Sequence, residues 1–193
     1  MHTRSDKLNR SVFLLAAVCL TACTAGYQRS QVATGSDTPE ARSEPPAYLE
    51  KVAALGDDLA ALNGRTNLAE AGDLAQTAIS YAYRLADEYR VVRPAVFHNL
   101  LVRMGLKDRG LCYQWTEDLM NRLDSMHLQS FQLHWGVAHR GSELREHNTV
   151  VVTARGQPFE EGIVLDPWRN SGDLFWARVK NDHYPWKKRM PGE

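Results

Sequence analysis

A cysteine, a histidine and an aspartate follow one another in an order suited to nucleophilic catalysis. Cys112 lies in the stretch Gly-Leu-Cys-Tyr-Gln-Trp at 110–115, His147 opens an apolar run, and Asp166 closes another. A thiol becomes a good nucleophile when a histidine takes its proton and a carboxylate fixes the histidine tautomer. The order therefore predicts Cys112 as nucleophile, His147 as general base and acid, and Asp166 as the group that orients the imidazole.

Each of these residues also has a structural interpretation. Cys112 could be a small buried apolar residue, as unpaired cysteines often are. His147 could simply begin a strand, and Asp166 before a proline could simply start a turn. Tyr113, Trp115 and Trp168 are candidates to line a substrate pocket, although a position in the core or at the pocket rim is the favoured interpretation of Trp168. The catalytic interpretation requires the three polar side chains to converge in the folded chain, whereas the structural interpretation does not.

A metal site would need more ligands than this spacing provides. His134 and His139 could join His147 and Asp166, but they are five residues apart on a predicted strand and so point to opposite faces. We therefore expect no metal and no cofactor.

The N-terminus has the three parts of a secretory signal: basic residues, an apolar run at 12–20, and small residues before Cys23. The apolar run is too short to span a membrane well. The stretch Leu-Thr-Ala-Cys at 20–23 resembles the lipobox of bacterial lipoproteins. This resemblance implies cleavage after residue 22, a lipid on Cys23 and, because Thr24 is not aspartate, an outer-membrane location facing the periplasm. Cys19 would leave with the signal, so Cys112 would be the only free thiol.

Three parts of the chain follow from composition. Residues 1–22 are the predicted signal peptide, 23–46 a polar, proline-broken tether carrying the lipid, and 47–193 one folded domain. The 23 basic and 23 acidic side chains balance, so no overall field favours nucleic acid. The predicted membrane contact is the lipid anchor.

The domain itself reads as helices followed by strands. Apolar periodicity predicts helices over about 48–62 and 68–89, another beginning at Pro94, and a fourth beginning at Cys112. The third helix has an apolar stripe of Phe97, Leu100, Leu101 and Met104. Strands are predicted over 129–138, 148–154, 162–165 and 174–179. The closing basic run 187–189 reads as a solvated tail. We expect an α+β domain with a mostly antiparallel sheet.

The fourth helix places Cys112 at its first turn, where the helix dipole favours a thiolate. The glycine before the cysteine, the aromatic residues after it, the histidine at a strand start and the Leu-Asp-Pro at 165–167 together resemble the transglutaminase-like superfamily within the papain-like fold. This resemblance implies thiol acyl-transfer chemistry. One oxyanion donor would be the backbone N–H of Cys112, and candidates for the second are His98, Asn99 and Tyr89.

Two functions remain in competition. The first is a lipid-anchored periplasmic thiol hydrolase or acyltransferase, acting without a cofactor on envelope peptides, proteins or peptidoglycan stems. The second is a non-catalytic envelope lipoprotein that uses the same scaffold to bind a partner. Cys112 is reactive in the first and buried in the second.

Overall fold

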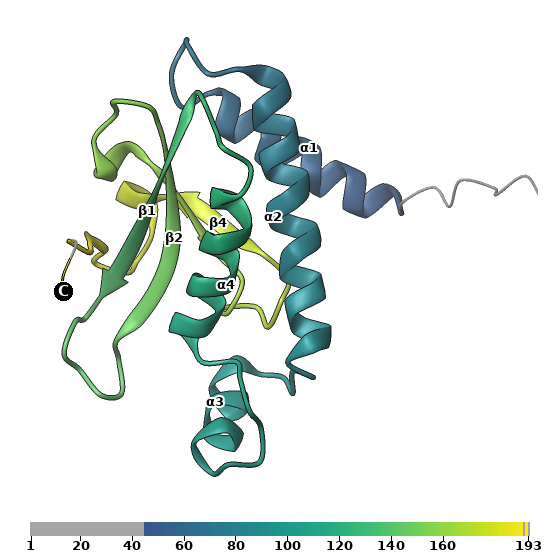
Figure 1. The fold of residues 1–193 in the computed structure, drawn as a ribbon, viewed down its shortest axis with the longest axis vertical. Helices are drawn as coiled ribbons and strands as arrows, with labels where there is room; N and C mark the ends of the chain where they lie inside the picture. The colour runs from purple at the N-terminus through teal and green to yellow at the C-terminus, as the bar shows by residue number, and fades with distance from the viewer. Residues whose placement is uncertain (1–44, 191, 193) are drawn as a thin grey trace, which may run out of the picture. The chain divides into compact units, whose positions relative to one another are not determined.

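The computed structural model of the protein describes residues 45–190 and 192, which form an α+β fold (Figure 1). The α+β prediction is confirmed. The predicted signal peptide, the lipidated Cys23 and the tether up to residue 44 lie outside the described residues. The elements in the described part are α1 (Pro46–Ala60), α2 (Leu68–Glu88), α3 (Ala95–Arg103), α4 (Cys112–Asp124), β1 (Phe131–Ala138), β2 (His147–Ala154), the 3₁₀ turn η1 (Phe159–Glu161), β3 (Ile163–Asp166), β4 (Phe175–Arg178), the 3₁₀ turn η2 (Val179–Asn181) and β5 (Lys187–Lys188).

The five strands make one antiparallel sheet in the order β4-β3-β2-β1-β5. Strand β2 is central and every one of its eight residues is buried. Successive side chains on a strand point to opposite faces. Accordingly Val150 and Val152 join the helix-side core, while Val151 joins a smaller cluster on the other face. The valine-rich run of β2 thus reflects burial on both sides.

Three helices cover one face of the sheet. Helix α4 packs on β1 and β2, α2 packs on α4, and α1 packs on α2 (Figure 1). Asn67 caps the N-terminus of helix α2, where its side chain accepts the Glu70 N–H and so satisfies one of the free first-turn donors. The core combines apolar side chains from these helices and the strands: Leu55, Leu59, Leu74, Ile79, Leu119, Leu123, Phe131, Val150, Val152, Ile163, Leu165 and Leu174.

Helix α3 differs from the prediction because its apolar stripe faces outwards. Its buried residues are Ala95 and His98, whereas Leu100 is 49% exposed and Met104 is 62% exposed. The periodicity correctly indicated a helix but not the side that is buried. A small alanine and a hydrogen-bonded histidine are the buried residues of this nine-residue helix. Of the predicted stripe, Phe97, Leu100 and Met104 are exposed and Leu101 is half-buried.

The closing basic run is also different from the prediction. Lys187 and Lys188 form β5, which pairs with Val137 and Gly136 of β1. Their side chains are exposed. Exposed lysines are common on edge strands as well as in solvated tails, so the charge pattern alone did not distinguish the two. Within residues 45–190 and 192, no helix combines the length and apolarity that crossing a membrane would require.

Candidate active site

Helix α4 holds Cys112 at its N-terminal end. Gly110, two residues earlier, has a φ of +128°, and a Cβ there would lie 2.3 Å from Nε2 of His98. The Gln114 side-chain oxygen accepts the N–H groups of Gly110 at 2.8 Å and Leu111 at 3.0 Å. These bonds satisfy backbone donors just before the helix and fix its start. The cysteine is partly exposed at the first turn.

A buried histidine supports this turn from behind. The Val92 N–H donates to Nδ1 of His98 at 3.2 Å, and Nε2 of His98 donates to the Arg109 carbonyl at 2.9 Å. Trp115 donates its indole N–H to the Gly110 carbonyl at 2.9 Å and lies in the core, only 1% exposed. The structure thus places Trp115 away from the pocket for which it was a candidate and gives it a role in holding the turn.

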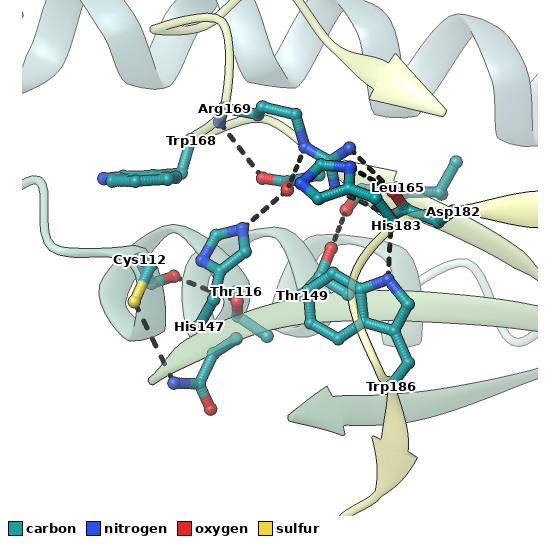
Figure 2. A network of polar contacts seen from close by, with 12 residues as sticks. Cys112, Thr116, His147, Thr149, Leu165, Trp168, Arg169, Asp182, His183 and Trp186 are labelled. Carbon is teal, nitrogen blue, oxygen red and sulfur yellow. Dashed lines mark hydrogen bonds and ion pairs between the residues drawn. The ribbon is translucent and has the colours of Figure 1, made fainter. Parts of the chain in front are cut away.

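His147 and Asp166 meet across adjacent strands. His147 is the first residue of β2, Asp166 is the last residue of β3, and the imidazole Nε2 donates to Oδ2 of Asp166 at 2.6 Å. The other ring nitrogen, Nδ1, faces the Cys112 sulfur (Figure 2). Among the described residues, it is the one buried side-chain nitrogen or oxygen without a hydrogen-bond partner. The structure therefore brings together the three residues of the predicted relay.

The surroundings of His147 favour its protonated form. Burial alone lowers its pKa, but the hydrogen bond and negative charge of Asp166 raise it, and the nearby Cys112 adds to the rise. The net result is a pKa of about 9, against an ordinary value of 6.5. At neutral pH the imidazolium is the dominant form, with one N–H towards the carboxylate and the other towards sulfur.

A chain of alternating charges continues behind Asp166 (Figure 2). Arg169 donates from Nε to the same Asp166 oxygen at 3.0 Å and from its two terminal nitrogens to Asp182 at 3.0 and 2.7 Å. Trp186 also donates to Asp182, at 2.8 Å. Sequence reasoning missed Arg169, Asp182 and Trp186. The one available signal was the position of this arginine, three residues after Asp166. At that spacing its backbone N–H can close a turn by donating to the carboxylate, and in the structure it donates to Oδ1 of Asp166 at 3.1 Å.

Aromatic rings enclose the imidazole. The ring centroids of Trp168, Tyr184 and Trp186 lie 4.6, 4.9 and 5.3 Å from that of His147. The Trp168 indole donates to Oδ1 of Asn99 at 3.0 Å, so it is itself fixed. Such packing limits the movement of the histidine and keeps water from its hydrogen bond to Asp166.

An open groove of about 820 Å³ runs past the sulfur. Tyr113 and Trp168, two of the predicted pocket residues, line it. Its other lining includes exposed apolar side chains from α3 and from the loop between β1 and β2, among them Val96, Leu100 and Leu144. A substrate placed in this groove would have an apolar surface beside the thiol.

The remaining histidines of interest are separate from the relay. His134 is buried and hydrogen-bonds Thr153 at 2.9 Å. Burial, with a smaller contribution from the Lys188 charge, lowers its pKa to about 4. His139 follows β1 and lines the groove. In the described part of the chain, no three His, Cys, Asp or Glu side chains are grouped as metal ligands would be.

We compared the chain with models of known protein families, with curated proteins and with solved structures, and none of them matches it.

Proposed function

We propose that the protein is a thiol hydrolase or acyltransferase with Cys112 as nucleophile, His147 as general acid and base, and Asp166 as the orienting carboxylate. The observation that carries this proposal is the His147 imidazole, buried between a carboxylate on one nitrogen and a partly exposed thiol on the other. A structural histidine would have both nitrogens satisfied, as His98 has.

The reaction follows from where the protons lie. In the proposed reaction Nδ1 of His147 takes the proton of Cys112, and the resulting thiolate attacks a substrate carbonyl carbon, forming a sulfur–carbon bond. The carbonyl π electrons move to oxygen and then return, breaking the bond to the leaving group, which takes the proton from the imidazolium. Water or an amine then attacks the thioester, gives its proton to His147 and releases the thiolate. Asp166 keeps the imidazolium oriented throughout.

The proposed substrates are peptides or proteins of the bacterial envelope, including peptidoglycan stems. The lipobox-like stretch before Cys23 supports this location, and the open groove, with its apolar lining, supports an extended substrate over a small enclosed one. The transglutaminase-like, papain-like assignment belongs to the same proposal. It is supported by a thiol at a helix N-terminus facing a histidine and an aspartate on adjacent antiparallel strands.

Acyl-enzyme formation tests the proposal. The chain without its signal segment, incubated with p-nitrophenyl acetate, should gain one acetyl group on Cys112, detected by intact mass and peptide mapping, and Cys112→Ala should gain none. A panel of envelope peptides with and without an added amine would then identify the acyl donor and separate hydrolysis from transamidation. Equal acetylation of the native chain and Cys112→Ala would reject the proposal and leave the non-catalytic envelope lipoprotein.

A further inference from the structure

Asn148, the residue after the proposed base, has a carboxamide fixed in one orientation. Its side chain is buried, and the indole N–H of Trp135 donates to its Oδ1 at 2.7 Å. An indole nitrogen can only donate, so the oxygen of the amide must be the atom that faces Trp135. The Nδ2 group is consequently directed to the other side.

That other side is the sulfur. Nδ2 of Asn148 lies 3.9 Å from Sγ of Cys112 and 3.5 Å from Oε1 of Glu146. The amide nitrogen has two protons. One proton can remain with the Glu146 carboxylate while the other points into the groove, which Asn148, Glu146 and Cys112 all line.

The strand geometry explains why two neighbouring residues both reach one thiol. Consecutive side chains on β2 point to opposite faces of the sheet, and β2 begins beside the N-terminal end of α4. His147 therefore approaches Cys112 from one face and Asn148 from the other. An acyl-transfer site needs this arrangement, with a proton acceptor on one side of sulfur and a hydrogen-bond donor for the carbonyl oxygen on another.

We infer that Asn148 is the second donor of the oxyanion hole, acting with the backbone N–H of Cys112, and that Trp135 is its positioning residue. This inference rests on the proposed function. When sulfur bonds to the substrate carbon, the carbonyl π pair moves to oxygen. That oxygen lies on an atom bonded to Sγ, so it can reach the hydrogen-bonding distance of about 2.7–3.1 Å from Nδ2. When the oxyanion re-forms the carbonyl, its hydrogen bond to Nδ2 weakens and the leaving group departs.

The three donors considered from the sequence are used elsewhere or have no contact with sulfur. His98 is bonded through both ring nitrogens behind Gly110. The Tyr89 hydroxyl is hydrogen-bonded to Asp118. Asn99 lines the groove with its oxygen held by Trp168, but its hydrogen bond is to that indole and none joins it to Cys112. Of these asparagines, Asn148 is the one that contacts the nucleophile.

Two reagents separate this role from nucleophile activation. Iodoacetamide alkylates a thiolate by displacing iodide from carbon, with no oxyanion formed, whereas p-nitrophenyl acetate must pass through one. In Asn148→Ala we expect the acetylation rate of Cys112 to fall by about 10²-fold, while the iodoacetamide rate stays within about twofold. Trp135→Phe keeps the carboxamide but removes the donor that aims it, so a smaller loss of acetylation with unchanged alkylation is expected. Asn121→Ala, on the exposed face of α4, is the matched control.

The outcomes distinguish this inference from the proposed function. Normal acetylation of Asn148→Ala, or a selective loss in Asn99→Ala in its place, would overturn the assignment of Asn148 and leave the Cys112 nucleophile intact. Failure of the native chain to acetylate Cys112 would overturn both. If Asn148→Ala does not fold, the ratio of the two rates in Trp135→Phe decides, and an unchanged ratio counts against the inference.

Discussion

Two histidines on neighbouring strands are buried to nearly the same degree, but their pKa values are shifted in opposite directions. His134 on β1 is 6% exposed and His147 on β2 is 3% exposed. The pKa of His134 falls to about 4, because burial and the Lys188 charge both disfavour its cation. The pKa of His147 rises to about 9, because Asp166 and Cys112 outweigh its burial. Partners, rather than depth, decide which histidine holds a proton.

The surroundings of the two rings differ in the same way. His134 meets the hydroxyl of Thr153 and, in a T-shaped arrangement, the ring of Phe159, both neutral. His147 meets a carboxylate on one side and opens towards a thiol and a groove on the other. A neutral, enclosed histidine is suited to packing, whereas a charged histidine facing a thiol is suited to proton transfer. The following predictions test this contrast.

The largest difference is expected in thiol reactivity. At pH 6 an ordinary cysteine is only roughly 0.3% ionised, so loss of the imidazolium in His147→Ala should slow iodoacetamide alkylation of Cys112 by about 10²-fold. His134→Ala should change the rate by less than about twofold. Alkylation followed by mass spectrometry measures the rate in each variant. Equal rates in His147→Ala and His134→Ala would show that the two histidines do not differ in their effect on Cys112.

Removing the hydrogen-bond partner of each histidine should also affect the alkylation rate of Cys112 differently, with a smaller difference than removing the histidines themselves. Asp166→Asn replaces the carboxylate that stabilises the His147 imidazolium, so the pKa of His147 should fall. Alkylation of Cys112 at pH 6 should then slow about tenfold. Thr153→Val removes the hydroxyl beside His134 and should leave alkylation unchanged. Circular dichroism checks folding of Asp166→Asn, because Arg169 loses a partner in this variant. A Thr153→Val effect as large as that of Asp166→Asn would be inconsistent with the contrast.

Stability should respond to pH with opposite signs for the two residues. Between about pH 6.5 and 9 the folded state holds a proton on His147 that the unfolded state has released, so its stabilising contribution is lost as pH rises. Between about pH 4 and 6.5 the unfolded state protonates His134 while the folded state does not, so stability is lost as pH falls. Each effect is on the order of 1–3 kcal/mol.

Denaturant titration across pH 4–9 in the Cys112→Ala background separates the two windows, because a Cys112 thiolate in the folded state would have released a proton and would offset the one that His147 holds. His147→Gln should flatten the alkaline side of the profile and leave the acidic side, and His134→Gln should do the reverse. A variant that flattens both sides, or neither, would show that the raised and lowered pKa values are wrongly assigned.

The smallest expected effect concerns Lys188. Its charge contributes less than burial to the lowered pKa of His134, so Lys188→Ala should raise that pKa by roughly a few tenths of a unit, leaving it well below 6.5. NMR titration of the imidazole measures the change, and the pKa of His147 serves as an internal control. A fall in the pKa of His134 would contradict the assigned cause.

The sequence predicted the parts of this molecule that depend on local pattern. Helix α4 begins at Cys112, as the glycine turn before it and the apolar spacing after it indicated, and β2 and β3 coincide closely with the predicted strands. The ordered Cys112, His147 and Asp166 could be proposed because their strand-end and helix-start positions have local signatures.

Features set by tertiary contacts could not be found this way. The two-residue β5 has no periodicity of its own and exists through pairing with β1. The outward face of α3 depends on what its neighbours leave open, and periodicity gives only that a face exists. Asp182 and Trp135 act across 13 residues on Arg169 and Asn148, respectively, and nothing local to either residue indicates its partner.

Direct observation of the His147 ring tests the central claim most closely. In the chain labelled with ¹⁵N-histidine, NMR should show His147 as the doubly protonated imidazolium at pH 7, titrating near pH 9. In Cys112→Ala that transition should move to lower pH, because the sulfur no longer contributes to the raised pKa. A His147 ring that is neutral at pH 7, or that titrates identically with and without the thiol, would contradict the proposed relay.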